Sequence, residues 1–313
     1  MNSNIPYNGD LPLDQANRLA WRGNPREALP LYDAIIAEDP SNARAFAFRG
    51  LAHRRAGDCS RALADCDHAL RLDPTFAMGH VIRGSTHREL GDFARAIADY
   101  SAAIALEPDY AAAYANRALS HEGLGDFESA LADYTRAIAA NPDYGAAYNN
   151  RGLALAVMGR YEEAIADYDA AVRLDPDDPS GYYNRGLARA ALEEYEGAID
   201  DYDAALALDD TDAALYVNRG AAYDALGETW QAIQDYSQAI VLDQESAEAL
   251  YNRGLCYSEL GEYPQAVQDF NAAIRLAPKD PDAYRARGDA YAGMGDIGRA
   301  AVDFEKAEGL AGG

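Results

Sequence analysis

The sequence predicts an all-α fold, an α-solenoid made of tandem pairs of antiparallel helices. Three observations predict it: a period of 34 residues, helical spacing of apolar residues on both sides of a central Gly, and a Pro near the end of most periods. Set in rows of 34, the chain forms nine rows without an insertion or deletion, starting at residues 9, 43, 77, 111, 145, 179, 213, 247 and 281. Because one helical hairpin cannot bury its own apolar face, the rows are expected to stack.

The row that begins at Gly145 shows the expected elements. Apolar and small residues recur at helical spacing over residues 148–155 and again over residues 164–172. Gly159 lies between the two stretches and can adopt a left-handed helix cap. Pro176 follows the second stretch, where it cannot donate a helical hydrogen bond. Each row is therefore predicted to hold two helices joined by a tight turn.

Columns of small and aromatic residues predict how these helices pack. Small residues let two helix axes approach closely, and an aromatic side chain fills the remaining space. The first helices carry Gly or Ala at Gly50, Gly84, Ala118, Gly152, Gly186, Gly220, Gly254 and Gly288. The second helices carry Ala at Ala62, Ala96, Ala130, Ala164, Ala198, Ala232, Ala266 and Ala300, and an aromatic at Tyr100, Tyr134, Tyr168, Tyr202, Tyr236, Phe270 and Phe304.

The period, the small residue, the turn Gly, the Ala and aromatic pair and the closing Pro resemble the tetratricopeptide repeat family over residues 9–313. The resemblance implies a right-handed superhelix with a concave groove lined by first helices, partners that are peptides or proteins, and no chemistry of its own. Row one carries Pro30 within its second helix and is expected to be a degenerate cap, preceded by a flexible segment at residues 1–8. In row six Glu193 replaces the turn Gly, and a looser turn is expected there.

Arg and Asp columns sixteen residues apart predict a ladder of ion pairs. Row one lacks both members, having Gln15 and Leu31 instead, and this joint loss favours contact within a row or across a row boundary. The alternative is that copied rows merely share an ancestor. The members are Arg49, Arg83, Arg117, Arg151, Arg185, Arg219, Arg253 and Arg287 with Asp65, Asp99, Asp133, Asp167, Asp201, Asp235, Asp269 and Asp303. This ladder is interpreted as architecture and not as a binding site.

Five consecutive rows carry Asn directly before the ladder Arg, at Asn116, Asn150, Asn184, Asn218 and Asn252. An Asn amide has one acceptor and two donors, so one Asn per row could hold the main chain of an extended peptide. Related asparagine ladders occur in the tetratricopeptide repeat family and look similar. The alternative is that these amides bond only locally.

The other predicted groove residues divide into three zones, which favour a partner segment that is acidic at one end, apolar in the middle and basic at the other. Rows two and three are basic, with Arg44, Arg54, Arg55 and Arg88. Rows four to six are apolar or small, with Ala115, Leu119, Leu153, Val157, Tyr183 and Leu187. Rows seven to nine are acidic, with Asp224, Glu248, Glu259, Asp282 and Asp289. The alternative is that these charges only keep the surface soluble.

Composition excludes several other functions. A net charge of −25 argues against binding nucleic acid, because phosphate contacts need clustered Lys and Arg. We see no signal peptide in residues 1–10 and no apolar run long enough for a bilayer. The cysteines, Cys59, Cys66 and Cys256, fit a reduced, cytoplasmic protein, and the excess of Arg over Lys hints at a bacterial source.

No catalytic, cofactor or metal site is predicted. All five histidines, His53, His68, His80, His87 and His121, lie in rows two to four, and a metal site with Cys59 and Cys66 is imaginable. However, no compact ligand spacing is present, and His53, His87 and His121 stand where later rows have Tyr, so packing is favoured. The chain is therefore interpreted as a non-catalytic scaffold that binds a peptide or protein. The alternative is a self-assembling array that stacks end to end through its last helix, as a homo-oligomer.

Overall fold

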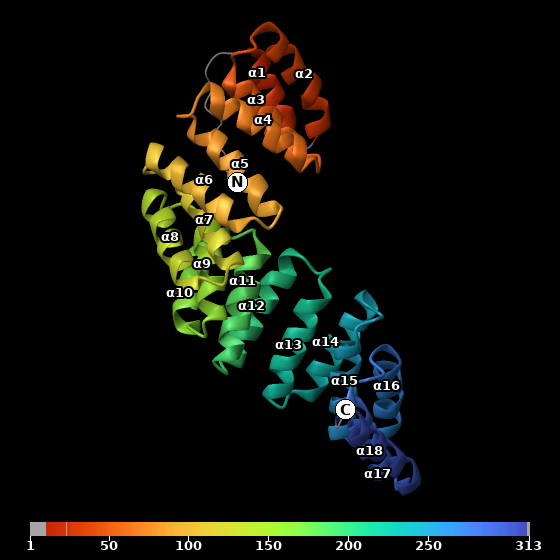
Figure 1. Cartoon of the computed structure of the whole chain (residues 1–313). Helices are drawn as coiled ribbons and strands as arrows, with labels where there is room; N and C mark the ends of the chain where they lie inside the picture. The colour runs from red at the N-terminus through yellow and green to blue at the C-terminus, as the bar shows by residue number, and fades with distance from the viewer. Residues whose placement is uncertain (1–10, 23, 312–313) are drawn as a thin grey trace. The chain divides into compact units, whose positions relative to one another are not determined.

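The computed structural model describes residues 11–22 and 24–311, and the prediction of an all-α fold is confirmed for this part of the chain (Figure 1). It contains eighteen helices and no strand. They are α1 (Leu11–Arg22), α2 (Pro25–Glu38), α3 (Ala43–Arg55), α4 (Cys59–Leu72), α5 (Ala77–Glu89), α6 (Phe93–Leu106), α7 (Ala111–Gly123), α8 (Phe127–Ala140), α9 (Gly145–Val157), α10 (Tyr161–Leu174), α11 (Pro179–Ala191), α12 (Tyr195–Leu208), α13 (Ala213–Ala225), α14 (Thr229–Leu242), α15 (Ala247–Glu259), α16 (Tyr263–Leu276), α17 (Pro281–Gly293) and α18 (Ile297–Ala311).

The helices fall into two compact units, and each is described by itself. Unit 1 extends to Ala154 and unit 2 begins at Leu155. Apart from α9, which crosses the boundary, the two helices of a row pack together within each unit, and each second helix packs on the first helix of the next row. First helices of neighbouring rows touch as well, α3 on α5 and α5 on α7 in unit 1, and α11 on α13, α13 on α15 and α15 on α17 in unit 2. Each unit thus has a continuous surface of first helices, which we call its first-helix face.

Row one departs from the other rows less than its sequence predicts. Helix α2 continues from Pro25 to Glu38 with Pro30 inside it. The segment 1–8, expected to be flexible, lies outside the described residues. None of the described helices has the length and apolar character that a membrane span requires.

In rows two to nine a tight turn joins the two helices, and a left-handed residue makes it possible. Gly159 has φ of 75° and Gly227 has φ of 74°, a region that costs little for Gly because it lacks a Cβ. Glu193 takes the same conformation with φ of 63°. Its amide donates to Ala190 O at 3.0 Å, as the amide of Gly159 donates to Ala156 O at 3.0 Å. The prediction of a looser turn at Glu193 is therefore wrong. The turn has the same backbone hydrogen bond as the turn at Gly159, and Glu193 adopts a left-handed conformation that is unfavourable for a residue with a Cβ.

Replacing Glu193 with Gly is expected to stabilise the chain. A non-Gly residue in the left-handed region costs roughly 1–2 kcal/mol, part of which the flexibility of Gly in the unfolded chain offsets. We expect Glu193→Gly to raise the free energy of unfolding by about 0.5–1 kcal/mol, measured by urea unfolding. The matched control is Gly227→Ala in the next row, which should lower it. A loss of stability in Glu193→Gly contradicts the explanation.

The small and aromatic columns pack as the sequence predicts. Gly186 lies against Tyr202, where an added Cβ would be 2.7 Å from the ring atom Cε1. Gly254 lies against Phe270 in the same way, also at 2.7 Å. The rings of Tyr100, Tyr134, Tyr202 and Phe270 are completely buried. Glycine therefore serves here by its lack of a side chain, because it leaves room for the aromatic ring of the second helix.

The ladder exists, and its pairs are bidentate. Arg185, for example, donates through Nε to both carboxylate oxygens of Asp201, at 3.1 Å, and through Nη2 at 2.5 Å. The same Nε and Nη2 contacts join Arg49 to Asp65, Arg83 to Asp99, Arg117 to Asp133, Arg219 to Asp235, Arg253 to Asp269 and Arg287 to Asp303. Arg151 belongs to unit 1 and Asp167 to unit 2, so their pairing stays a prediction.

Each ladder Arg also reaches across the row boundary. Its Nη1 donates to a side chain sixteen residues earlier, on the second helix of the preceding row. The acceptors are Asp33, Asp67, Ser101, Thr135, Asp169, Asp203, Ser237 and Asn271. These bonds answer the question that the sequence left open, since the guanidinium bonds both within its row and across the boundary. Bonding to Asp201 raises the pKa of Arg185 against the opposing effect of burial.

Candidate functional site

In unit 2 the Asn column lies on the first-helix face, on α11, α13 and α15. Asn218 donates from Nδ2 to Ala214 O at 2.9 Å and to the hydroxyl of Tyr183, in the preceding row, at 3.1 Å. The same amide also has an acceptor oxygen, Oδ1. Asn184 and Asn252 occupy the same position in their helices and are half-buried. The local bonds orient the amide of Asn218 and leave its acceptor for another molecule.

Tyr183 and exposed leucines make the same face partly apolar. Tyr183 packs at 6.2 Å from the ring of Tyr202, and Leu187 and Leu255 are exposed one helical turn from the Asn column. Burial and the charge of Asp212 raise the pKa of Tyr183, while the hydrogen bond from Asn218 offsets part of this effect. Asn amides, an aromatic ring and two exposed leucines thus lie together on neighbouring first helices. Such a surface suits a segment with an exposed main chain and apolar side chains.

Acidic side chains border this face. Glu248 is exposed on α15 and its charge reaches Tyr183. Asp224 accepts a hydrogen bond from the thiol of Cys256 at 3.4 Å, and Glu259 accepts from Thr229 at 3.2 Å. Asp282 and Asp289 are exposed on α17. Of the 52 acids in the chain, 32 fall in residues 155–313, against 12 of the 27 bases.

In unit 1 the first-helix face carries the predicted Asn and Leu side chains on α7 and α9. Asn116 donates from Nδ2 to Ala112 O at 2.7 Å, so its amide is held by its own helix. Asn150 is half-buried and Leu153 is exposed at their places on α9. The local bond of Asn116 agrees with the alternative that these amides bond within their helix. It also leaves Oδ1 and one N–H of Asn116 for a partner.

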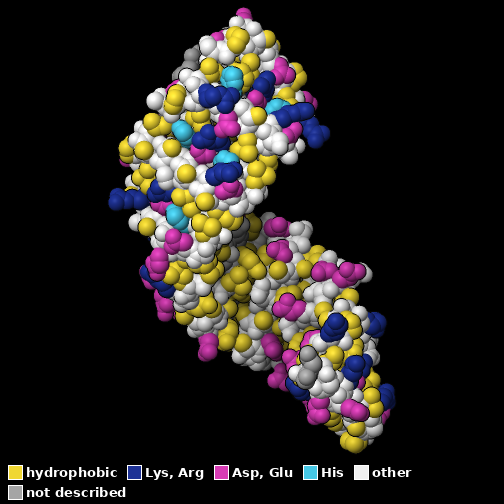
Figure 2. Space-filling model, viewed as in Figure 1, with side chains coloured by type: hydrophobic (Ala, Val, Ile, Leu, Met, Phe, Trp, Pro, Cys, Tyr) yellow, Lys and Arg dark blue, Asp and Glu magenta, His cyan; other side chains and the backbone are white. Residues whose placement is uncertain are grey.

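The predicted arginines of rows two and three lie on α3 and α5 in unit 1. Arg54 donates from Nη1 to Glu89 at 3.1 Å. Arg44 lies 5.8 Å from the centre of the Phe76 ring, and Arg55 lies 5.8 Å from the centre of the Trp21 ring. Arg88 is half-buried on α5. Figure 2 shows dark-blue basic side chains gathered with cyan histidines over the region that Figure 1 labels α3 to α6.

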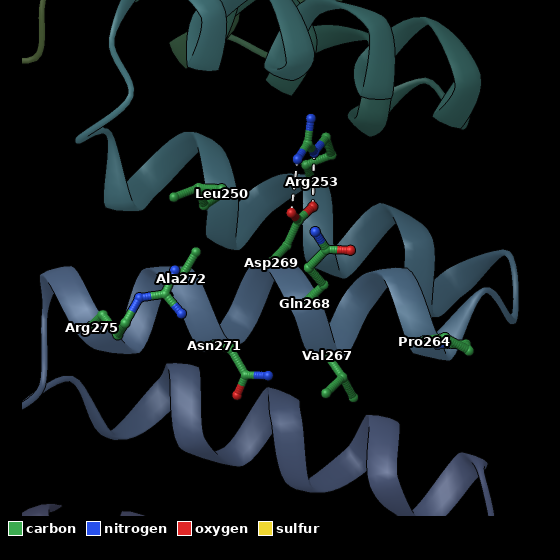
Figure 3. Close-up of a pocket in the computed structure, with 9 residues that line it drawn as sticks. All are labelled: Leu250, Arg253, Pro264, Val267, Gln268, Asp269, Asn271, Ala272 and Arg275. Carbon is green, nitrogen blue, oxygen red and sulfur yellow. Dashed lines mark hydrogen bonds and ion pairs between the residues drawn. The ribbon is translucent and has the colours of Figure 1, made fainter.

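A pocket lies on α15 and α16 (Figure 3). Arg253 donates to both oxygens of Asp269 in this pocket and to Ser237 across the row boundary. Figure 3 shows Leu250 and Arg275 at one end of the pocket and Pro264 at the other. Because its central charges are already paired, we assign the pocket to the ladder.

Four histidines, His53, His80, His87 and His121, lie beside the ladder, whereas His68 packs on the ring of Phe46. The Nε2 atom of His53 lies 3.9 Å from the carboxylate of Asp65, and that of His121 lies 3.9 Å from the carboxylate of Asp133. The Nε2 atom of His87 lies 4.0 Å from the carboxylate of Asp99. Burial lowers the pKa of His53 against the attraction of Asp65. No group of three His, Cys, Asp or Glu side chains within residues 11–22 and 24–311 is arranged to hold a metal. Burial also raises the pKa of Cys256 to about 12, which keeps its thiol protonated.

The sequence did not predict two sets of hydrogen bonds to the ladder. Arg189 occupies the position of these histidines in row six and donates to Asp201 at 2.8 Å, so this Asp serves two arginines. The signal in the sequence was an Arg at a position where other rows have His or Tyr. The acceptors across the row boundary were missed because their column mixes Asp, Ser, Thr and Asn, which share an acceptor oxygen but not an identity.

Comparison with known proteins gives the same repeat along the chain. A family model described as tetratricopeptide repeat matches residues 13–75, 83–144, 116–179 and 157–213, and another with this description matches 247–280. A third, described as TPR repeat, matches 225–261. No curated protein matches the chain.

Solved structures resemble the chain over half of its length or more. MamA is 28% identical with a TM-score of 0.51, covering 53% of this chain and 91% of its own. YrrB, whose description is a TPR protein with an unusual peptide-binding site, is 26% identical with a TM-score of 0.51, covering 56% of this chain and 91% of its own. A tetratricopeptide repeat protein from Parabacteroides merdae is 20% identical with a TM-score of 0.56, covering 79% of this chain and 98% of its own, and shows the fold alone.

Proposed function

Because the chain belongs to the tetratricopeptide repeat family, whose repeats build protein-interaction scaffolds, we propose that the first-helix face of unit 2 binds an extended peptide segment of a partner. The observation that carries this proposal is the bond from Asn218 to Tyr183, which fixes an amide between two rows and leaves Oδ1 as an acceptor. The likeness to YrrB, a protein described by its peptide-binding site, supports the same class of partner.

The spacing of the Asn column suits an extended main chain. Asn184, Asn218 and Asn252 stand once per row on neighbouring helices that touch. Helices packed side by side lie about 8–10 Å apart, and two residues of extended chain cover roughly 7 Å. Successive amides can therefore meet peptide groups about every third residue. Leu187 and Leu255 lie beside them and can contact the apolar side chains in between.

The charge of this face selects the partner. Glu248, Asp282 and Asp289 are exposed around it, and Asp224 and Glu259 border it. Opposite charge steers association and excludes partners of the same sign. The preferred segment therefore carries Lys or Arg beside its apolar residues, and its binding weakens as salt increases.

Peptide display on the full chain tests the proposal. We expect the selected peptides to be basic and apolar, and the triple variant Asn184→Ala, Asn218→Ala, Asn252→Ala to bind them at least about tenfold more weakly, since three hydrogen bonds of about 0.5–1.5 kcal/mol each are lost. Fluorescence anisotropy with the selected peptide gives the dissociation constants.

The matched control removes amides from another surface. Gln234 and Gln238 are exposed on α14 outside the first-helix face, and Gln234→Ala with Gln238→Ala is expected to leave peptide affinity unchanged. Circular dichroism establishes that both variants remain helical. Unchanged affinity in a folded triple variant rejects the Asn column as the binding site.

A further inference from the structure

Buried polar atoms without a partner concentrate in rows two to four of unit 1. Seven buried side-chain N or O atoms in the described part of the chain lack a hydrogen bond. Five belong to these rows: Arg44 Nε, Arg54 Nε, Arg88 Nε, Glu122 Oε1 and Tyr134 Oη, of which Glu122 and Tyr134 interact with each other. Native proteins leave few such groups, because each one costs the free energy of its lost hydration. The other two, Tyr202 Oη and Ser258 Oγ, lie in separate rows, so the concentration in rows two to four calls for an explanation.

Two of these arginines converge on one buried hydroxyl. Arg54 on α3 and Arg88 on α5 are 34 residues apart and occupy the same position in neighbouring first helices that touch. Between them Tyr100 is completely buried and donates to Ser85 Oγ at 3.0 Å. Burial raises the pKa of Tyr100, and its hydrogen bonds with Ser85 and Arg88 and the charges of Arg88 and Arg54 lower it. Both guanidinium charges therefore reach the same small region of the first-helix face.

On α3 and α5 the four arginines outside the ladder share one acid of these helices, Glu89. Arg54 pairs with Glu89, while Arg44 and Arg55 lie on aromatic rings. For Arg88 no carboxylate of the described residues lies within ion-pair distance. The ladder arginines differ, because a carboxylate is held by two nitrogens at each of Arg49, Arg83, Arg117, Arg185, Arg219, Arg253 and Arg287. On α3 and α5 the arginines outside the ladder thus outnumber the acids by four to one.

We propose that Arg54 and Arg88 bind the phosphate group of a phosphorylated partner segment on the first-helix face of unit 1. A phosphate monoester carries −1.5 to −2 charges at neutral pH and three acceptor oxygens, so it neutralises two guanidinium groups where a carboxylate neutralises one. Planar guanidinium groups bind such oxygens in pairs. Arg44 and Arg55 add positive charge on the same helices. This site goes beyond the proposed function, since it lies in the other unit and needs no Asn column.

Binding of phosphate to the full chain tests the site directly. Calorimetric titration with inorganic phosphate, at constant ionic strength set by chloride, is expected to give saturable binding. A peptide with one phosphoserine should bind more tightly than inorganic phosphate and at least tenfold more tightly than the same peptide with Ser or Glu. If titration with phosphate and titration with chloride give the same binding heat, the proposed site is wrong. A phosphopeptide no tighter than inorganic phosphate overturns the assignment to a partner segment.

Two variants separate this site from general charge effects. Arg88→Gln is expected to weaken phosphate and phosphopeptide binding by about 10- to 100-fold, because it removes charge-assisted hydrogen bonds. Arg95→Gln is the matched control: Arg95 is exposed on α6 and pairs with Asp92, the N-cap residue of that helix. The affinity of the Arg95→Gln variant for phosphate and for the phosphopeptide should equal that of the unsubstituted chain. The same affinity loss in both variants, or none in either, rejects the site.

Stability without phosphate provides a second readout, independent of any ligand. Because Arg88 is half-buried with an unpaired Nε, Arg88→Met is expected to keep or raise the urea midpoint of unfolding. An arginine that served the scaffold would lower this midpoint on replacement. A lower midpoint in Arg88→Met therefore assigns Arg88 to the scaffold and overturns the proposal.

Discussion

Asp201→Ala is expected to lower the free energy of unfolding by about 3–5 kcal/mol, because it leaves buried positive charge without its acceptor. Asp201 is 2% exposed and accepts hydrogen bonds from both Arg185 and Arg189. After the substitution Arg185 keeps only Asp169 of its two acids, and Arg189 keeps only the carbonyl of Gly197. Urea unfolding followed by circular dichroism measures the loss, and a broader transition would report that rows unfold separately.

The neighbouring residue gives the control for this prediction. Asp200 precedes Asp201 on α12 and is exposed, so Asp200→Ala removes the same charge and should change stability by less than about 0.5 kcal/mol. Replacing the whole group by apolar residues is expected to recover most of the loss, since a buried ion pair contributes little net stability. The variant is Asp201→Leu with Arg185→Met and Arg189→Met. Equal losses for Asp200→Ala and Asp201→Ala contradict the role assigned to burial.

The ladder shows why part of this fold follows from the sequence. Arg and Asp recur with the same spacing, and both disappear together at Gln15 and Leu31. A pattern of that kind predicts contact without any knowledge of geometry. The acceptors across the row boundary have the same spacing, but they range from Asp67 to Ser101 and Asn271, and only the positions of their oxygens reveal the pattern.

The first-helix faces were less predictable, because their contacts depend on side-chain conformations. Helical periodicity places Asn218 on this surface, yet its bond to Tyr183 requires the two rows to be packed at a particular distance. The pairing of Arg54 with Glu89 is also a contact between rows, 35 residues apart. The lack of a partner at Arg88 Nε is harder still to predict from the sequence, because it depends on the conformations of all neighbouring side chains.

Tyr202→Ala is expected to cost about 3–5 kcal/mol, the range for removing a large buried aromatic side chain and leaving a cavity. Tyr202 is completely buried against Gly186, which has no side chain to fill the space. Urea unfolding gives the free energy. Trp230 on α14 is the control, because it is aromatic but 58% exposed, and Trp230→Ala should change stability little. Comparable losses in the two variants contradict the packing explanation.

Removing only the hydroxyl of Tyr202 should not lower stability, in contrast to removing the whole side chain. Its Oη is buried without a hydrogen bond, so Tyr202→Phe is expected to leave stability unchanged or raise it by up to about 1 kcal/mol. Rows eight and nine already carry Phe270 and Phe304 at this position. Tyr32 provides the contrast, because its hydroxyl donates to the buried Asn17 Oδ1 at 2.8 Å, and Tyr32→Phe should cost about 1–3 kcal/mol. If both variants lose the same stability, the hydroxyl of Tyr202 has a partner in solution, and the polar cost assigned to this core position is wrong.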